Sequence, residues 1–441
     1  YDRFGRLTGQ LGPEGVAALN WLDALGEAPT QERIDGVYTT RGVTFTYDDA
    51  GRMISRTDPD GVWGQGRKTV YYYDDDGRLR FEVNAMGEAV ERRYDALGRL
   101  SETVAYANRV STQGMTGGLT SRLVSWPLVA SANDRRTVMS YTATGAVREI
   151  TDAVGVSTQL AYNAFGELSS RTDATGTTAQ PTTVLTTRAY DRRGLLTSTT
   201  IDSGGLNLTT QVIYDAFGRT IELKDPKQVQ GGLTGTRTAY DRAGRVIRTT
   251  DPSGDQISFT WDARGHQLTR TDALGRTTQW SVSAFGRRVA MTTPEGLVST
   301  TTYDENGLVQ AFTDGGSRTT TYVYDRNGDV VSITNGLGQV EAREYDNIGR
   351  LIETVDASGR VTRYAYDVVD RVLTETRDPD GLALTTRYVY DAFGGRTQVT
   401  DASGKVTVFE FDREGRQTTM VVDPSTYALR TTWTYDRAGQ V

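Results

Sequence analysis

The sequence predicts an all-β protein, one long antiparallel ribbon of β-hairpins that coils because it is too long to stay flat. Three observations support this prediction. A short cassette recurs along all 441 residues, two turn motifs fall in each repeat, and the segments between the turns alternate as strands do. Recurrence at a fixed period is the signature of a repeat architecture, so the period predicts the fold more strongly than any single motif.

The cassette opens with an aromatic residue or a substitute and most often reads Tyr-Asp-x-x-Gly-Arg. From Tyr240 to Tyr366 every step from one opening to the next is 21 residues. The eighteen openings are Tyr1, Tyr47, Tyr73, Tyr94, Tyr141, Tyr162, Tyr190, Tyr214, Tyr240, Trp261, Val282, Tyr303, Tyr324, Tyr345, Tyr366, Tyr390, Phe411 and Tyr435.

Each cassette is typical of a tight turn. Asp at the first turn position can hydrogen-bond to the backbone that follows, and Gly three residues later tolerates the left-handed conformation that closes a hairpin with a bulge. Where this Asp is missing, Thr142, Asn163 or Ser283 replaces it, and only Asp370 takes a glycine position. In three representative units the residues with this structural role are Tyr47, Asp48, Gly51 and Arg52; Tyr73, Asp74, Gly77 and Arg78; and Tyr345, Asp346, Gly349 and Arg350.

A second turn motif lies about 11 residues after most openings, as in Asp251-Pro252-Ser253-Gly254 and Asp356-Ala357-Ser358-Gly359. Two turns per unit leave two segments of about six residues, the usual length of a strand. Aromatic pairs such as Tyr322/Tyr324 and Tyr364/Tyr366 are two residues apart, so both rings of a pair lie on one face. No amphipathic helices alternate with these strands, and we therefore expect a largely single-layered sheet.

The number of strands predicts that the sheet curls. Eighteen units of two strands give 36 strands, which at about 4.8 Å each make a ribbon roughly 170 Å long. Open twisted sheets rarely exceed about ten strands without curling. If the ribbon made a single full turn, its radius would be about 27 Å, and its wall would be only about 20 Å tall.

Composition narrows the classes of partner. The net charge is −7, and the 49 basic and 56 acidic residues are intermixed, so no basic face for nucleic acid or an anionic membrane is evident. Cysteine is absent, which excludes disulfides and thiolate chemistry. No stretch approaches the roughly 20 apolar residues of a membrane helix, so we expect no membrane insertion. Both ends of the chain fall inside a repeat, and we expect a longer polypeptide.

We treat residues 1–441 as one continuous domain with two insertions. The first, residues 9–40, contains a predicted short helix from Pro13 to Gly26, with Val16, Leu19 and Leu22 on one stripe. The second, residues 104–136, is partly apolar and nearly free of acidic residues. Two roles remain open for each insertion: an ordinary surface loop, or a segment that covers a sheet edge or protrudes into the space that the sheet surrounds.

Residues for catalysis or metal binding are scarce. His266 is the only histidine and stands where ten units carry Arg, so the repeat explains its position. With one histidine and no cysteine, the chain has almost no residues for a Ser-His-Asp or Cys-His catalytic set, or for a histidine-rich zinc site. Asp74-Asp75-Asp76-Gly77 lacks the alternating carboxylates and distal Glu of a calcium loop. A pair of turn acids meeting across strands remains formally open. We therefore predict no catalytic, cofactor or metal residues.

The cassette Tyr-Asp-x-x-Gly-Arg-Leu, as in Tyr73 to Leu79 and Tyr94 to Leu100, resembles the YD repeat of the Rhs family. That family includes bacterial Rhs polymorphic toxins, cocoon-forming components of insecticidal toxin complexes, wall-associated proteins and teneurins. The resemblance covers nearly the whole chain. It implies a β-ribbon that spirals into a hollow shell, often sheltering a toxic domain at the C-terminal end of the same polypeptide.

The resemblance also implies partners and a location. We expect the remainder of the same polypeptide as partner, as an N-terminal plug and a C-terminal toxin or cargo domain, with a secretion apparatus as a further candidate. The implied location is secreted or cell surface. Asp378-Pro379-Asp380-Gly381-Leu382 matches part of the aspartate-dependent motif of self-cleaving Rhs toxins, yet an ordinary unit follows at once, so we interpret it as a turn.

The leading functional hypothesis is a non-enzymatic encapsulating scaffold that encloses a cargo until delivery. The alternative is a cell-surface adhesion module whose aromatic and arginine-rich faces bind glycans or another protein. An enzyme acting through Asp378 is the third hypothesis. For the repeated Arg we expect pairing with turn aspartates of adjacent hairpins, where each exposed pair adds about 0–1 kcal/mol.

Overall fold

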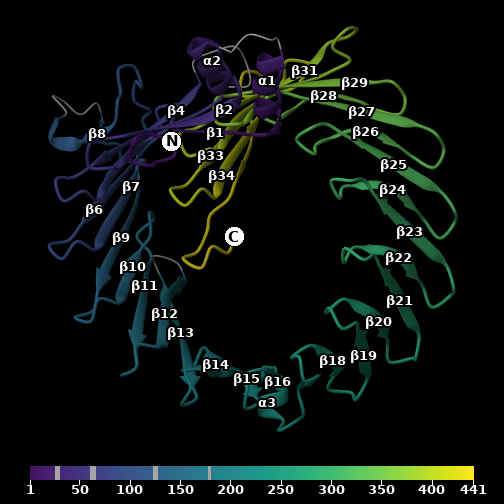
Figure 1. The fold of residues 1–441 in the computed structure, drawn as a ribbon. Helices are drawn as coiled ribbons and strands as arrows, with labels where there is room; N and C mark the ends of the chain where they lie inside the picture. Colours follow the sequence, from purple (N-terminus) through teal and green to yellow (C-terminus); the bar gives the residue numbers. More distant parts are fainter. Residues whose placement is uncertain (25–29, 60–65, 123–127, 177–179) are drawn as a thin grey trace.

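The chain forms a single antiparallel β-sheet that curls into an open spiral. A computed structural model describes residues 1–441 apart from 25–29, 60–65, 123–127 and 177–179. Within the described residues, 35 strands belong to one sheet, and nearly every strand pairs with the next one along the chain. Figure 1 shows this ribbon curving around a central axis. The predicted all-β hairpin ribbon is confirmed, and the sheet does not close into a barrel.

The strands are short, as predicted. The first eighteen are β1 (Gly9–Leu11), β2 (Gly42–Tyr47), β3 (Met53–Asp58), β4 (Arg67–Tyr73), β5 (Leu79–Val83), β6 (Ala89–Tyr94), β7 (Leu100–Ala105), β8 (Gly118–Leu119), β9 (Arg135–Tyr141), β10 (Val147–Thr151), β11 (Ser157–Tyr162), β12 (Leu168–Gly176), β13 (Pro181–Tyr190), β14 (Leu196–Ile201), β15 (Leu208–Tyr214), β16 (Thr220–Lys224), β17 (Thr236–Tyr240) and β18 (Val246–Thr250). The rest are β19 (Gln256–Trp261), β20 (Gln267–Thr271), β21 (Thr277–Val282), β22 (Arg288–Thr292), β23 (Val298–Tyr303), β24 (Val309–Thr313), β25 (Thr319–Tyr324), β26 (Val330–Thr334), β27 (Val340–Tyr345), β28 (Leu351–Val355), β29 (Val361–Tyr366), β30 (Val372–Arg377), β31 (Leu384–Tyr390), β32 (Arg396–Thr400), β33 (Val406–Phe411), β34 (Gln417–Val422) and β35 (Leu429–Thr432).

The cassette closes each hairpin as a type I turn followed by a bulge. In the unit that opens at Tyr345, the N–H of Gly349 donates to the carbonyl of Asp346 at 3.0 Å, and the N–H of Asp346 donates to Arg350 at 2.9 Å. Gly349 has φ +84°, in the left-handed region where a side chain is strained. Glu344 pairs with Glu353 and Tyr345 with Leu351, so the register shifts here and the extra residue of the bulge, Ile352, lies on β28 opposite the opening residue.

The second turns repeat this geometry on the opposite edge of the ribbon. In the turn that begins at Asp272, Gly275 has φ +77° and its N–H donates to the carbonyl of Asp272 at 2.9 Å. Ser317 and Asp370 occupy glycine positions with φ +63° and +69°. Because successive turns of a meander lie on opposite edges, the ribbon has a first-turn edge, formed by the cassettes, and a second-turn edge.

Two helices lie in the segment 9–40, one more than the sequence indicated. They are α1 (Pro13–Ala24) and α2 (Gln31–Arg41), and the predicted end of the first helix at Gly26 falls outside the described residues. Thr30 caps α2 by accepting a hydrogen bond from the N–H of Arg33. β1 pairs with β2 and forms the first edge of the sheet. A third helix, α3 (Pro226–Gln230), fills the turn between β16 and β17.

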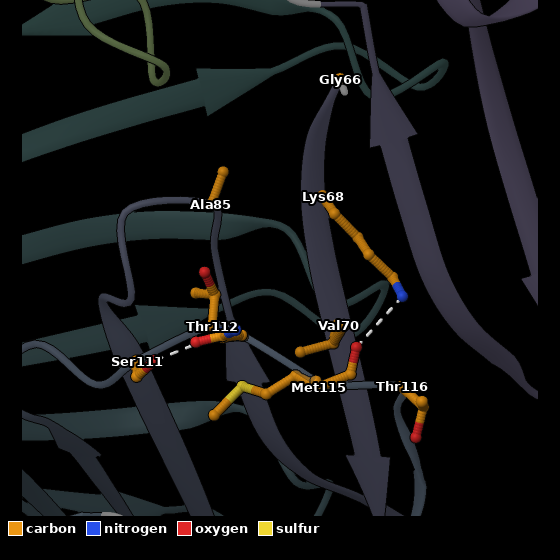
Figure 2. A pocket seen from close by; sticks show the side chains of 10 residues that line it. Gly66, Lys68, Val70, Ala85, Ser111, Thr112, Met115 and Thr116 are labelled. Carbon is orange, nitrogen blue, oxygen red and sulfur yellow. Dashed lines mark hydrogen bonds between the residues drawn. The ribbon is translucent and has the colours of Figure 1, made fainter. Parts of the chain in front are cut away.

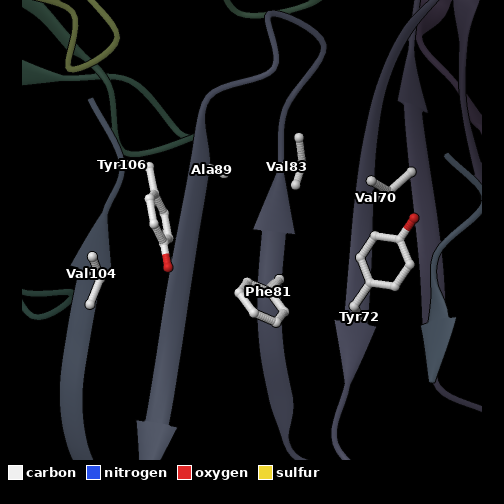
Figure 3. Close-up of a cluster of buried hydrophobic side chains, with 7 residues drawn as sticks. All are labelled: Val70, Tyr72, Phe81, Val83, Ala89, Val104 and Tyr106. Carbon is white, nitrogen blue, oxygen red and sulfur yellow. The ribbon is translucent and has the colours of Figure 1, made fainter. Parts of the chain in front are cut away.

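The segment 104–136 covers one face of β4 to β7 and builds the main apolar core. Figure 3 shows the buried cluster, which consists of Val70, Tyr72, Phe81, Val83, Ala89, Val104 and Tyr106. Val110, Met115 and Leu128 of this segment pack against it. The segment also supplies β8, which pairs in parallel with β4, and β7 pairs with β9 beyond it. The segment therefore lies on a sheet face, and it also reaches the adjoining edge, where Arg109 donates to Glu88 and to the carbonyl of Asp391, both at 2.9 Å.

The ribbon makes more than one turn, so the radius of about 27 Å that a single full turn would have does not apply. Hydrogen bonds connect residues that are 301, 283 and 261 positions apart in the sequence. The turn between β33 and β34 accordingly meets the turn between β10 and β11, and Figure 1 shows the end of the ribbon returning to the side where the chain begins. A winding of about 25 strands has a contour of about 120 Å and a mean radius of about 19 Å, which rises to about 25 Å if the strands tilt by about 40°.

Successive windings meet edge to edge along a line that we call the seam. It joins the second-turn edge of residues 67–176 to the first-turn edge of residues 368–437. Arg67 pairs with Asp370 at 2.5 Å, and Arg371 pairs with Glu88 at 3.1 Å. Further along, the N–H of Ala153 donates to Glu414 Oε1 at 2.9 Å, and the N–H of Arg437 donates to the carbonyl of Gly176 at 2.7 Å. The seam makes the wall taller than one strand.

The left-handed turn glycines should be intolerant of any side chain, even where space is free. Around Gly275 nothing lies within 4 Å of an added Cβ, so Gly275→Ala tests the backbone alone. We expect a loss of about 1 kcal/mol in the local stability of β20 and β21, measured by native-state hydrogen exchange. Gly36→Ala, inside α2 and equally unobstructed, is the control and should be neutral or stabilising. Equal effects of the two substitutions would contradict this explanation.

Candidate functional site

The sheet has no covering second layer over most of its length, and a repeated contact between neighbouring units takes its place. The opening aromatic residue of one unit reaches back to the unit before it. In the unit at Tyr366 the phenol O–H donates to the carbonyl of Leu351 at 2.6 Å. Leu351 is the sixth residue after the previous opening, Tyr345. The aromatic residue is therefore both a strand residue and a link to the preceding hairpin.

This hydrogen bond recurs at every opening that has a suitable donor and a preceding unit. It is made by fourteen tyrosines and, through its indole N–H, by Trp261. These residues are Tyr47, Tyr73, Tyr94, Tyr141, Tyr162, Tyr190, Tyr214, Tyr240, Trp261, Tyr303, Tyr324, Tyr345, Tyr366, Tyr390 and Tyr435. The donor to acceptor distances run from 2.6 Å at Tyr366 to 3.1 Å at Tyr345.

The arginine that follows the turn glycine completes the link. Arg350 Nε donates to Asp346 Oδ2 at 2.7 Å inside its own turn, and its guanidinium carbon lies 5.1 Å from the centre of the Tyr366 ring. Its Nη1 also donates to the backbone carbonyl of Asp367 in the next turn at 3.3 Å. The expected pairing with an aspartate of an adjacent hairpin is made by Arg350, whose Nη1 lies 3.1 Å from Asp370 Oδ1. The pairing that recurs along the chain is with the aspartate of the same turn, because four residues around a tight turn bring the two side chains together.

The residues that the sequence singled out take these positions. Gly51 and Gly77 have φ +83° and +81°. Tyr47, Tyr73 and Tyr345 donate to backbone carbonyls of the preceding unit, and Asp48, Asp74 and Asp346 each pair with the arginine of their own turn, at 2.6–2.8 Å. Arg52 and Arg78 lie over the rings of Tyr73 and Tyr94, at 5.3 Å and 4.8 Å. The predicted structural residues thus come together as one contact between units, which we call the unit link.

Several turn aspartates have a lowered pKa. The backbone N–H of Arg99 and then its guanidinium lower the pKa of Asp95. Likewise the N–H of Arg245 lowers the pKa of Asp241. At Asp262 the His266 side chain takes the place of arginine, with Nδ1 at 2.8 Å from Oδ2, and lowers the pKa of Asp262 to about 2. These shifts are those of structural ion pairs.

Four consecutive units depart from this link. His266 replaces arginine in the unit at Trp261, Ser283 replaces aspartate in the next, and Leu308 and Asp329 replace arginine in the two after that. Desolvation and then the charge of Asp325 raise the pKa of Asp329. An ideal Cβ built on Gly349, in the next turn, would lie 3.4 Å from Asp329 Oδ2, so this carboxylate reaches the space that a linking arginine occupies elsewhere.

Sequence reasoning missed the hydrogen bond of the opening residue to the previous unit. A signal for it was present, because the openings are tyrosine fifteen times and phenylalanine once. Packing alone does not prefer a phenol to a phenyl ring, whereas a buried hydroxyl needs a partner. The acceptor is a backbone carbonyl, which every residue has, so no residue type in the sequence indicates it.

None of the other candidates assembles a reactive site. Asp74 and Asp76 both pair with Arg78, and Asp75 accepts a hydrogen bond from Ser121 at 2.7 Å. Asp378 accepts from the N–H of Leu382 at 2.9 Å, in a loop whose backbone bonds recur at Asp202 and Asp423. In the described part of the chain, no three His, Cys, Asp or Glu side chains gather as metal ligands would.

A pocket of about 800 Å³ lies beneath the segment 104–136 (Figure 2). Hydroxyl and amide side chains from Ser111 to Thr116 line it on one side, and Lys68 and Val70 of β4 on the other. The Lys68 ammonium donates to the carbonyl of Met115 at 3.1 Å, so it ties the segment to the sheet. No acidic or imidazole group lines this pocket, and it offers no acid-base pair. Across the described ranges, none of the helices is long and apolar enough to cross a membrane.

Removing the phenol oxygen of a unit link should weaken it locally. Tyr366→Phe leaves the carbonyl of Leu351 without its partner, and we expect a loss of about 1 kcal/mol in the protection of β28 and β29 amides. Hydrogen exchange followed by mass spectrometry measures it. The control is Tyr322→Phe, because the Tyr322 hydroxyl has no recorded partner among the described residues. A loss of the same size in the control would reject the role of the hydrogen bond.

The departure at Asp329 should be reversible by mutation and dependent on pH. Asp329→Arg should rebuild the pair with Asp325 and stack on Tyr345, stabilising β25 to β28 by about 0.5–1 kcal/mol. Asp329→Asn should stabilise at pH 7. The folded pKa is raised above 3.8, so the ionised carboxylate destabilises above that pKa, and the benefit of Asn disappears as pH falls below 3.8. Hydrogen exchange at pH 7, with thermal unfolding at pH 7 and pH 3, checks both predictions. A benefit of Asn that is independent of pH would contradict the electrostatic cause.

Comparison with known proteins identifies the repeat. The RHS Repeat family matches residues 1–62, 141–178, 240–277, 261–300, 303–340, 345–383 and 390–428. The crystal structure of TcdB2-TccC3-Cdc42 is similar over 96% of this chain and 24% of that one, with 15% identity and a TM-score of 0.64. A Tc holotoxin pore of Photorhabdus luminescens, with a TccC3 substitution, shares 14% identity over 95% of this chain and 28% of that one, with a TM-score of 0.31.

These comparisons define the fold and the family. No curated protein matches the sequence. The present chain spans about a quarter of the TcdB2-TccC3-Cdc42 chain that it matches. The matched segments cover more than half of the 441 residues, and they contain thirteen of the eighteen cassette openings. The chain therefore belongs to the RHS repeat family.

Proposed function

We propose that this chain is a non-enzymatic section of a shell that encloses a polypeptide cargo until delivery. The observation that carries the proposal is the seam, where the ribbon returns to its own edge after one winding and bonds to it. A rod or an open adhesive sheet does not require the ribbon to bond to its own edge after one winding. A wall that must exclude solvent and proteases needs consecutive windings to meet without a gap.

The dimensions of the spiral set a limit on the cargo. A winding with a mean radius of about 19–25 Å, less about 5 Å for the inward side chains, leaves a free radius of about 14–20 Å. A compact domain of about 100 residues has a radius of gyration of about 13 Å. The proposal is therefore restricted to a small domain or a segment of chain, unless further windings add length along the axis.

The seam contacts are strong enough to keep such a wall closed. The Arg67 and Arg371 side chains are only 12% and 15% exposed, and each meets a carboxylate of the facing winding. Arg135 lies 4.0 Å above the ring of Phe393. Half-buried pairs of this kind are weakened less by salt than exposed ones. Their removal leaves an unpaired charge in the contact, which costs more than an exposed pair contributes.

The chemistry of the described side chains supports a passive role. The arginines and aspartates are committed to unit links and to the seam, and the aspartate loop at Asp378 satisfies its own backbone. The cargo that we propose is the remainder of the same polypeptide, with a C-terminal toxin as the leading candidate and an N-terminal plug closing an end. Delivery by a secretion apparatus, and a secreted or surface location, belong to the same proposal.

Opening the seam should expose the cargo. In the full-length polypeptide that contains this segment, Arg67→Glu with Glu88→Arg places like charges opposite Asp370 and Arg371 and leaves the unit-link arginines unchanged. We expect proteinase K to digest the enclosed segment in this variant and to spare it in the parent, as measured by intact mass after limited digestion. Arg377→Glu, at an exposed pair with Glu375, is the control and should keep protection. Digestion of the enclosed segment in the parent protein would overturn the proposal.

A further inference from the structure

One contact between consecutive units lacks both side-chain parts of the unit link. It joins the unit at Tyr390 to the unit at Phe411, and we call it the Phe411 joint. Phe411 has no hydroxyl to donate to the preceding unit. Gly395 stands where the link arginine belongs, and it is the only glycine at this position among the eighteen units. From these two units themselves, the joint therefore has the ladder between β32 and β33 but no unit link.

An arginine of the other winding lies in the place of the missing one. Arg135 begins β9, on the second-turn edge of the earlier winding. Its guanidinium carbon lies 4.0 Å from the centre of the Phe393 ring, in the turn of the unit at Tyr390. In the next turn, an ideal Cβ built on Gly415 would lie 3.4 Å from Arg135 Nη2 and 3.5 Å from Nη1. Arg135 thus contacts two consecutive turns across the seam.

Link arginines elsewhere in the chain contact their two turns in the same way. Arg219 lies 5.1 Å from the centre of the Phe217 ring in its own turn. Its Nη1 would lie 3.9 Å from a Cβ built on Gly244 in the next turn, and Arg52 Nη1 approaches the glycine of its next turn at 3.3 Å. An arginine in place of glycine in the Tyr390 unit would therefore need the space that Arg135 fills.

The seam alone holds Arg135 in this position. Arg219 Nε donates to Asp215 Oδ2 at 2.7 Å, so a link arginine is normally fixed by the aspartate of its own turn. Arg135 Nε is buried and has no hydrogen-bond partner among the described residues. Its contacts with the two turns of the later winding, including the stacking on Phe393, are what position it. If the windings separate, the Phe411 joint loses its arginine.

We propose that Arg135 completes the unit link of the Phe411 joint from the other winding, so that this joint is firm only while the seam is closed. Separation of the windings then releases a hinge at the same time, and the hairpins beyond Phe411 turn away from the earlier winding together. Closure of the seam and order at the joint stabilise each other. The coupling is between two contacts of this chain, so it holds whether or not a cargo is enclosed.

Hydrogen exchange of the full-length polypeptide, followed by mass spectrometry, reads the joint through the amides of β32 and β33. Arg135→Ala should make these amides exchange about fivefold faster, because a partly buried stacking contact is lost. Adding Gly395→Arg supplies the arginine from its own unit and should restore exchange to within about twofold of the parent. The backbone of Gly395 does not have a left-handed φ, so it accepts a side chain.

The control is Arg136→Ala, which removes the neighbouring arginine of β9. Its carboxylate partners, Glu102 and Asp134, belong to its own winding, so the amides of β32 and β33 should keep their exchange rates. The joint between the units at Tyr240 and Trp261 has its own arginine and its own donor. Exchange in β18 and β19 should therefore stay unchanged in every variant.

Opening the seam at another point tests the coupling itself. Arg67→Glu with Glu88→Arg should speed exchange in β32 and β33 about fivefold in the parent background, and by less than about twofold in the presence of Gly395→Arg. Three outcomes would each overturn the proposal: unchanged exchange in Arg135→Ala, no restoration by Gly395→Arg, or an equal effect of seam opening in the two backgrounds. None of them depends on the digestion of a cargo, so this proposal fails separately from the proposed function.

Discussion

The structure depends on one contact, the hydrogen bond from the opening tyrosine of each unit to the backbone of the unit before it. A single-layered sheet buries little on either face, so its backbone ladders alone leave each hairpin free to twist against the next. The phenol of Tyr366 on the carbonyl of Leu351, with Arg350 over the ring, fixes that angle. Because the same geometry recurs at each unit, small fixed rotations add up to a regular spiral instead of an irregular coil.

The local structure could be predicted from the sequence, and the long-range structure could not. Asp346 and Gly349 specify their turn through contacts within five residues, which is why turns, strands and the single sheet were predictable. The recurring partner of the turn arginines, the aspartate of their own turn, was not predicted, because a motif does not reveal which aspartate is nearer. The seam was also unpredictable. Arg67 and Asp370 meet only because the rotations of about thirteen units sum to one winding, and no motif encodes that sum.

The unit link also explains which departures from the repeat the fold tolerates. Trp261 keeps the hydrogen bond with a different donor, and His266 keeps the pair with aspartate. Val282 keeps neither the donor nor the ring, yet its strand retains the ladder and the bulge. The weak links fall together in the units from Trp261 to Tyr324 rather than being scattered along the chain. Flexibility should therefore concentrate in one sector of the wall, opposite the part of the spiral where the seam adds a second set of contacts.

The seam joins the windings of the repeat into one wall, and it needs only a few residues at the turns to do so. At the seam, a ring beneath an arginine or an arginine facing a carboxylate is enough to join one winding to the next. Phe393 under Arg135 and Arg371 beside Glu88 are the two arrangements within this chain. These contacts join residues about 260 to 280 positions apart in the sequence, so side chains at the ribbon edges add the long-range order that the strand pairing between neighbouring hairpins cannot supply.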